Sequence, residues 1–285
     1  MKSLYWSLRR CARYLRNYFV QKVVQKEFSG LVHKVDYTYE RAGVPKVWIV
    51  WWQGKDTMPM LVKNCYQSVV EHNPDMEVVV IDQNNFQEYV QLPDYVISKL
   101  NSGSITLTHM SDILRFALLS QWGGWYLDST LFLFSHLPRT EDLFTIKHSQ
   151  TFYDVHSGVW TGFFWYMPKG HPLAVFMNKA LNAYWETHDK LIAYFLVDHL
   201  LRLYYDKQPL FRSYIDALSI NNQDLYFFRG PKAFEPYDQE EWNRIVSKTF
   251  IFKFNRKIRP IPSRKDIPDG TYMAWLVDNC FKEWE

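Results

Sequence analysis

Hydrophobic and polar residues follow two periods along this chain, one typical of strands and one typical of helices. Short runs rich in β-branched and aromatic residues predict strands over 44–54, 76–81, 125–127, 131–134, 143–147, 159–167 and the start of 250–259. Apolar residues at helical spacing predict helices over 2–28, 59–72, 84–89, 92–100, 105–122, 172–185, 191–205 and 272–281. Strands and helices that alternate in this way form βαβ units, so the pattern predicts an α/β domain.

The helix over 105–122 is apolar around nearly all of its circumference, and its only certain charges are Asp112 and Arg115. These two residues share one helical face, where a charge pair is costly to bury unless its groups satisfy each other or meet a polar ligand. The glycine pair 123–124 ends the helix, and a short strand then places Asp128 beyond its carboxyl end. Ligands of α/β sheets bind at such strand ends. The pattern predicts functional residues here, with a structural salt bridge and a strand-end turn as the alternatives.

The order Ser-Asp-Ile-Leu-Arg at 111–115, Gly-Gly at 123–124 and Tyr-Leu-Asp at 126–128 resembles the capsular polysaccharide synthesis family, which is related to the DXD-type glycosyltransferases of the GT-A fold. The resemblance runs from about Val44 to about Lys257. It implies a GT-A-like, Rossmann-type nucleotide-sugar-binding domain with additional helices. The corresponding division of the chain is a basic amphipathic helix at 1–30, a glycosyltransferase domain at 31–259, and a C-terminal tail and helix at 260–285.

The resemblance also implies roles for the central residues. Asp112 and Arg115 would face the donor sugar, the carboxylate accepting from its hydroxyl groups and the guanidinium donating to sugar or phosphate oxygens. Asp128 would hold a divalent cation, Mn²⁺ or Mg²⁺, that bridges the diphosphate. The second acid of the DXD motif falls at Thr130. Either acids from elsewhere complete the metal site, or metal binding is weak or absent.

Other donor contacts come from the resemblance as well. Trp51 would stack on the base, with Gln53 and Gly54 near the ribose or phosphates, and Gly124 completes this part of the donor set. The alternative for the tryptophans is the core, although strand alternation sends residues 51 and 52 to opposite faces. Asp82 follows the second strand and would contact ribose or base, or cap the next helix.

The second half of the chain adds three candidates. Lys253 and Lys257 would compensate the diphosphate charge and close over the donor, or else form a solvated basic surface. Asp198 would face the acceptor or complete the acid set as a catalytic residue; its alternative is an i,i+4 ion pair with Arg202.

The N-terminal helix over 2–28 is basic and amphipathic, with an apolar stripe at Leu4, Leu8, Cys11, Leu15, Phe19 and Val23 and most basic residues off that stripe. Two interpretations stay open. The helix binds an anionic membrane surface, or it packs on the main domain or a partner subunit. Arginines interrupt the segment before an apolar run forms, so we expect neither a signal peptide nor a membrane span.

Composition narrows the function further. A formal net charge of +3 and the lack of a nucleic-acid-binding pattern argue against nucleic acid as a partner. Three widely separated cysteines argue against a disulfide framework or a zinc site and favour the cytoplasm.

Together with the resemblance, these features predict a glycosyltransferase, retaining in type and peripheral on the inner face of the cell membrane. It would move a sugar from a nucleotide-diphospho-sugar to a lipid-linked capsular or exopolysaccharide acceptor. The alternatives are a non-catalytic carbohydrate-binding or assembly subunit and a sugar-phosphate transferase.

Overall fold

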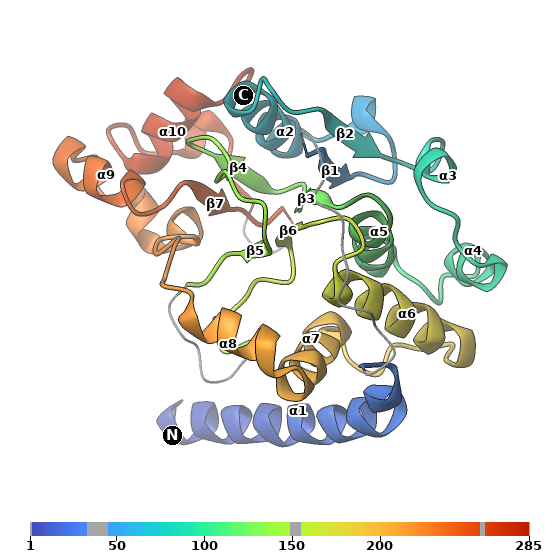
Figure 1. The fold of residues 1–285 in the computed structure, drawn as a ribbon. Helices are drawn as coiled ribbons and strands as arrows, with labels where there is room; N and C mark the ends of the chain where they lie inside the picture. The colour runs from blue at the N-terminus through green and yellow to red at the C-terminus, as the bar shows by residue number, and fades with distance from the viewer. Residues whose placement is uncertain (1, 33–44, 149–154, 257–259, 285) are drawn as a thin grey trace.

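A five-stranded sheet forms the centre of the molecule, with helices on both of its faces (Figure 1). The computed structural model describes residues 2–32, 45–148, 155–256 and 260–284. The strand order in the sheet is β2 (Val78–Ile81), β1 (Val47–Val50), β3 (Gly124–Leu127), β6 (Phe164–Met167) and β5 (Phe144–Thr145). β1 is parallel to β2 and to β3, whereas β6 is antiparallel to β3 and β5. The predicted α/β class is confirmed, and the carboxyl ends of β1, β2 and β3 meet at one edge.

Most of the helices overlap the predicted ranges. The helices are α1 (Lys2–Val32), α2 (Met60–His72), α3 (Phe86–Tyr89), α4 (Asp94–Asn101), α5 (Leu107–Trp122), α6 (Pro172–Thr187), α7 (Leu196–Lys207), α8 (Pro209–Ala217), α9 (Gln239–Val246) and α10 (Tyr272–Cys280). No range was predicted for α8 or α9. Among the described residues, no helix combines the length and the apolar character needed to cross a bilayer.

A second, smaller sheet pairs β4 (Leu131–Leu133) with β7 (Ile251–Lys253) in antiparallel orientation. Its side chains pack with α9 and α10, which lie beside it in Figure 1. β4 follows β3 after a short turn, while β7 arrives from the far end of the sequence. The small sheet therefore brings the C-terminal part of the chain next to the end of β3.

Alternate residues of β1 enter two different cores. Trp48 and Val50 pack in the large cluster with α5 and α6, whereas Val47 and Ile49 pack on the opposite face with Val69 of α2. The sheet is thus the middle layer between α2 on one side and α5, α6 and α7 on the other.

The glycine pair lets β3 approach its neighbours closely. Gly123 and Gly124 have φ values of 67° and 95°, in the region that favours glycine. A Cβ atom on Gly123 would lie 2.4 Å from the backbone nitrogen of Lys169, and one on Gly124 would lie 2.5 Å from the carbonyl oxygen of Lys46. The Gly123 carbonyl also accepts a hydrogen bond from the indole of Trp48 at 2.8 Å. Both glycines are therefore required by backbone packing.

The predicted strand over 159–167 is too long, because only Phe164–Met167 pairs with β3. Residues before it turn past α7, where Gly162 lies against Asp198 and Val197. Apolar composition extends through this turn, so the sequence pattern alone does not mark where the strand begins.

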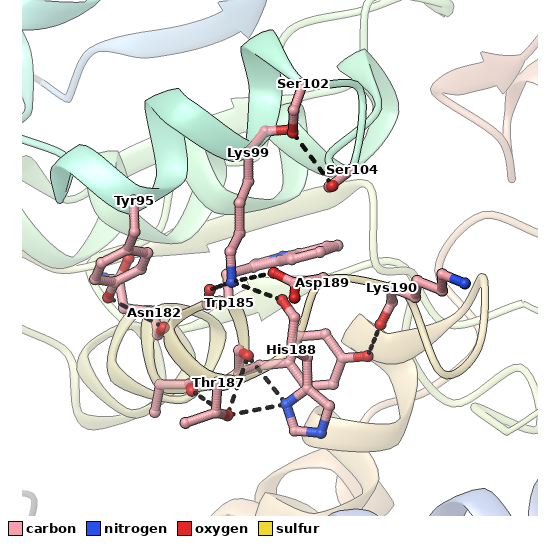
Figure 2. Close-up of polar contacts among 12 residues, drawn as sticks. Tyr95, Lys99, Ser102, Ser104, Asn182, Trp185, Thr187, His188, Asp189 and Lys190 are labelled. Atoms are coloured by element: carbon pink, nitrogen blue, oxygen red, sulfur yellow. Dashed lines mark hydrogen bonds and ion pairs between the residues drawn. The ribbon is translucent and has the colours of Figure 1, made fainter.

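Lys99 of α4 holds the C-terminal end of α6. Its ammonium donates to the carbonyl oxygens of Trp185 at 2.6 Å and His188 at 2.9 Å, and it lies 3.0 Å from a carboxylate oxygen of Asp189 (Figure 2). The last carbonyls of a helix lack intrahelical partners, and a cation is favourable there. α6 therefore ends at Thr187 and the chain turns away.

The helix predicted over 191–205 begins later than expected, at the start of α7. The hydroxyl of Tyr184 donates to the carbonyl oxygen of Lys190 and accepts from the backbone N–H of Ile192, each at 2.7 Å. These hydrogen bonds pair the backbone carbonyl of Lys190 and the backbone N–H of Ile192 without a helix. Residues 191–195 consequently form an anchored loop, although their composition is as apolar as that of the helix.

α1 packs against α7 and α6, along one side of the molecule, with a different stripe from the one predicted (Figure 1). The side chains that it buries recur every four residues, at Val20, Val24, Phe28 and Val32. The predicted stripe is not the face that packs on the domain, because Cys11, Leu15, Phe19 and Val23 are exposed; its interpretation as a membrane-binding face stays a prediction. Leu4 and Leu8 lie outside the described side chains. The helix carries apolar residues on two faces, and packing selects one of them.

Candidate active site

Asp128 lies immediately after β3, at the edge where the parallel strands end. Its backbone N–H donates to the carbonyl oxygen of Phe163 at 3.0 Å, which fixes the strand end against the turn before β6. Its Oδ1 accepts from the backbone N–H of Thr130 at 2.9 Å and from the Thr130 hydroxyl at 2.7 Å. This is an Asx-type turn that leads the chain from β3 into β4. Thr130, at the place of the second acid, therefore donates hydrogen bonds to the first acid.

Lys253 reaches the same carboxylate from β7. It stands opposite Leu131 in the β4–β7 pair, and its Nζ lies 2.5 Å from Asp128 Oδ1 and 2.5 Å from Thr130 Oγ1. The side chain of Lys253 is 13% exposed and that of Asp128 is 32% exposed. Burial alone would raise the pKa of Asp128, but the Lys253 charge and the Thr130 hydrogen bonds outweigh it and lower the pKa to about 2. The acid is therefore a carboxylate at neutral pH.

The charge pair of α5 faces this strand end. Arg115 Nη1 lies 2.9 Å from Asp112 Oδ1, and the Arg115 side chain is only 6% exposed. The guanidinium carbon lies 4.5 Å from the centre of the Tyr126 ring on β3. Burial raises the pKa of Asp112, opposed by Arg115 and by the nearby His109. Burial also raises the pKa of Tyr126 to about 12, so its hydroxyl keeps its proton.

Tyr126 and His109 belong to this cluster, although sequence reasoning gave neither a role. Tyr126 precedes Asp128 by two residues and so shares its face of the strand. His109 precedes Asp112 by one helical turn, and its Nδ1 lies 2.9 Å from the hydroxyl of the N-cap residue Thr106. Burial lowers the pKa of His109. The i,i+2 spacing on the strand and the i,i+3 spacing on the helix are the signals that would have found them.

Two exposed aromatic residues border the cluster on the anchored loop. The side chains of Tyr194 and Phe195 are 59% and 51% exposed, and their ring centres are 5.0 Å apart. The ring of Tyr194 meets His109 edge to face at 5.6 Å. Partial burial raises the pKa of Tyr194, and the charges of Asp112 and Asp128 add to the effect. The loop therefore borders the two carboxylates.

Trp51 and Trp52 point in different directions from the end of β1. The indole N–H of Trp51 donates to the Thr57 hydroxyl at 3.2 Å, and the guanidinium carbon of Arg256 lies 5.6 Å from a Trp51 ring centre. Trp52 instead packs on Phe86 with a centroid separation of 5.3 Å. Because Arg256 lies three residues after Lys253, Trp51 is close to the same C-terminal segment that reaches Asp128.

A sequence profile described as capsular polysaccharide synthesis protein matches residues 4–273. The chain belongs to this family. Among solved structures, the "PaToxG Glycosyltransferase" is 14% identical with a TM-score of 0.45, and the alignment covers 72% of this chain and 82% of that chain. No curated protein matches the sequence.

Two residues predicted to contact the donor border the end of β1. Gln53 is exposed. Gly54 has a φ of 92°, and a Cβ atom added to it would lie 3.5 Å from Oδ2 of Asp82. Oδ1 of Asp82 accepts from the backbone N–H groups of Asn84 and Asn85 at 2.7 and 3.1 Å. Asp82 therefore forms a turn that leads into α3. The predicted helix cap is wrong for this residue, because the N-cap position of α3 is Asn85.

Asp198 of the family member lies on the buried side of α7. Its Oδ1 accepts from the indole N–H of Trp160 at 3.1 Å and lies 3.6 Å from where a Cβ on Gly162 would be. The i,i+4 ion pair of this helix joins Arg202 to Asp206 at 2.9 Å. The contacts of Asp198 thus hold α7 against the segment before β6.

Two further residues, Gly124 and Lys257, are predicted to contact the donor. Gly124 begins β3 and packs on Lys46, whereas Asp128 follows the other end of the strand. The predicted contact of Gly124 with the donor stays a prediction, whereas its close approach to Lys46 gives it a role in backbone packing. Lys257 lies outside the described residues.

The cluster is not enclosed by either of two cavities in the described structure. A cavity of about 610 Å³ is lined by Ser135, Asn221 and Lys248 among others, and one of about 340 Å³ by Asn64 and Phe132 among others. Neither includes Asp112 or Asp128. Among the described residues, no three or more histidine, cysteine or acidic side chains converge as a metal site. In the part of the chain that the structure describes, the cluster therefore lies at the sheet edge outside both cavities.

Proposed function

We propose that this member of the family is a glycosyltransferase that uses a nucleotide-diphospho-sugar. The observation that carries the proposal is the meeting of two ion pairs at the end of β3. Asp112 with Arg115 comes from α5, and Asp128 with Lys253 comes from β3 and β7. Carboxylates accept from sugar hydroxyls, and a guanidinium and an ammonium bind phosphate oxygens. Sheet edges of this kind bind nucleotides.

The reaction needs the leaving nucleoside diphosphate to be stabilised as the bond to the sugar breaks. Arg115 and Lys253 are held before the donor arrives, so little reorganisation accompanies the charge that develops. Asp112 would orient the sugar through a hydroxyl. Positioning and leaving-group stabilisation would supply most of the rate acceleration. Trp51 would stack on the base and contribute about 1 to 3 kcal/mol to donor binding.

The acceptor would approach from the anchored loop. Tyr194 and Phe195 present exposed rings beside His109 and Asp112. Aromatic faces pack well on the C–H faces of sugar rings, and a fixed loop loses little entropy when it binds. The acceptor that fits the family is a lipid-linked capsular or exopolysaccharide unit.

A lipid-linked acceptor requires a position at the membrane, and α1 supplies a suitable face. Besides its buried stripe, α1 exposes aromatic and aliphatic residues, namely Tyr14, Leu15, Tyr18, Phe19 and Val23. Basic residues are exposed on the same helix, at Arg9, Arg10, Arg13, Arg16, Lys22 and Lys26. We propose a peripheral location on the anionic inner face of the cell membrane, through this surface.

The direct test is nucleotide release from UDP-, GDP-, CDP- and dTDP-sugars by the native protein and by Asp128→Asn. Release of a nucleoside diphosphate from one donor, reduced in the variant, supports glycosyl transfer. Proton NMR of the first product then tests the proposed retention of anomeric configuration. Release of a nucleoside monophosphate identifies a sugar-phosphate transferase. Neither turnover nor a donor-induced shift in melting temperature would favour the non-catalytic carbohydrate-binding subunit.

A further inference from the structure

We propose that Lys253 supplies the positive charge that a divalent cation supplies in a site with two acids, so that donor binding needs no metal. The inference rests on the proposed function, because it names how that site holds the diphosphate. It concerns three residues that the fold brings together, Asp128, Thr130 and Lys253.

The ammonium occupies the position between the two motif residues. Its nitrogen is 2.5 Å from Asp128 Oδ1 and 2.5 Å from Thr130 Oγ1. A lysine ammonium has three N–H donors, and these contacts use two of them. The third is left for a phosphate oxygen. The carboxylate beside it is 32% exposed, so the pair can be reached from the sheet edge.

The charges balance in the same way as in a metal site. A divalent cation on two carboxylates has a local sum of zero. At this site the second carboxylate is replaced by the neutral hydroxyl of Thr130, and one ammonium on one carboxylate again sums to zero. The replacement of an acid by threonine and of a metal by lysine therefore keeps the local net charge at zero.

The donor set does not fit Mn²⁺ or Mg²⁺. These hard cations need several oxygen ligands that are free to coordinate, and at this turn the described residues offer one carboxylate, that of Asp128, and the neutral hydroxyl of Thr130. Asp128 Oδ1 already accepts from Lys253 and twice from Thr130, and Asp112 is held by Arg115. A metal on Asp128 would also displace an ammonium that is only 13% exposed, at a large cost in unpaired charge.

Backbone pairing fixes the lysine at this point. The N–H of Phe254 donates to the carbonyl oxygen of Thr130 at 2.9 Å, and the N–H of Lys253 donates to that of Leu225 at 2.8 Å. The ring of Phe163 lies 4.9 Å from the ammonium. The pairing of β4 with β7 thus fixes the position of Lys253 beside Asp128. A lysine on a flexible surface segment would have no such fixed position.

Calorimetry with the nucleotides that match the active donor tests the proposal. Native protein in EDTA should bind the nucleoside diphosphate as tightly as in Mn²⁺, within about twofold. Lys253→Met should weaken the diphosphate about tenfold or more but leave the monophosphate within about threefold, because a charge-assisted hydrogen bond is lost. Lys253→Arg should recover part of the affinity. Lys46→Met is the matched control, since Lys46 pairs with Glu77 at 2.6 Å beside the amino end of β1.

A reverse experiment converts the site. Thr130→Asp combined with Lys253→Ala places two carboxylates at the turn without the lysine, and electron paramagnetic resonance should then detect saturable Mn²⁺ binding. The native protein should show none at micromolar Mn²⁺. One Mn²⁺ bound by the native protein, or no gain by the double variant while its circular dichroism is native-like, would overturn the inference.

The outcomes separate the inference from the proposed function. Donor turnover that EDTA abolishes and Mn²⁺ restores keeps the transferase and overturns the role of Lys253. Equal weakening of monophosphate and diphosphate by Lys253→Met also overturns it, because a purely structural lysine has that effect. Absence of nucleotide binding under every condition refutes the proposed function, and the inference with it.

Discussion

The guanidinium carbon of Arg115 lies 4.5 Å from the centre of the Tyr126 ring, so the central helix and the central strand meet through a cation and an aromatic face. Burial disfavours the charge on Arg115, but Tyr126 and Asp112 outweigh it and raise its pKa. The planar group is therefore stacked on one side and ion-paired on another. An ammonium cannot make both contacts with the same geometry.

Arg115→Lys should consequently lower kcat/KM for the donor about tenfold or more, although the formal charge is kept. Steady-state kinetics with the active donor measure the effect. Arg212→Lys is the control, because Arg212 also stacks on a tyrosine, Tyr205, at 5.3 Å but is exposed. Equal kcat/KM values for native protein and Arg115→Lys would contradict a donor-binding role for the guanidinium.

The part of the site that the sequence predicts is the part encoded locally. Asp112 and Arg115 are one helical turn apart, and Asp128 follows a short apolar strand, so helix and strand periods alone place them near one sheet edge. The same periods predicted α5 and β3 within a few residues. The local pattern was sufficient to predict α5 and β3, because the formation of each element depends mainly on residues that are close together in the chain.

The partner of Asp128 could not be derived in this way. Lys253 is separated from it by 125 positions, and only the pairing of β4 with β7 joins them. Similarly, α1 has apolar residues on two faces, and contact with α7 decides that Val24 is buried while Phe19 is exposed. These outcomes depend on tertiary contacts, and the spacing of hydrophobic residues along one sequence does not reveal which tertiary contacts form.

Tyr194→Ala and Phe195→Ala should raise the KM for the acceptor and leave the KM for the donor unchanged. The two rings are exposed on a loop whose backbone is fixed by Tyr184, so their removal changes a surface without altering the fold. An aromatic contact of this kind contributes about 0.5 to 1.5 kcal/mol, which predicts a change of roughly twofold to tenfold. Phe234→Ala is the control, as an exposed ring elsewhere. A change in donor KM alone would place the loop on the wrong side of the site.

The exposed face of α1 should bind vesicles that contain anionic lipid. Native protein should sediment with vesicles of phosphatidylglycerol and phosphatidylcholine, and Leu15→Glu combined with Phe19→Glu should remove most of the binding. Each basic residue near such a surface adds about 1 kcal/mol, so added salt should also weaken it. Leu210→Glu changes an exposed apolar residue on α8 and serves as the control. Equal sedimentation with vesicles of phosphatidylcholine alone would exclude an anionic membrane surface as the partner.

We expect His199 to make the stability of the fold depend on pH. It is fully buried on α7, and its Nδ1 donates to Oε1 of Gln21 on α1 at 2.8 Å. Burial, with a smaller contribution from the charge of Arg16, lowers the pKa of His199 from 6.5 to about 4. The unfolded chain takes up the proton near pH 6.5, but the folded chain does so only near pH 4. The stabilisation is complete above pH 6.5, is lost as the pH falls through this window, and levels off below pH 4.

Chemical denaturation between pH 7 and 4 should therefore show a falling free energy of unfolding, with His199 responsible for up to about 3 kcal/mol. His199→Gln keeps a neutral hydrogen-bonding side chain and should flatten the profile. A slope should remain, because burial also lowers the pKa values of His109 and His171. The control is His136→Gln, at an exposed histidine. If His199→Gln and His136→Gln retain the same slope, His199 does not carry the pH dependence, and the docking of α1 is insensitive to its protonation.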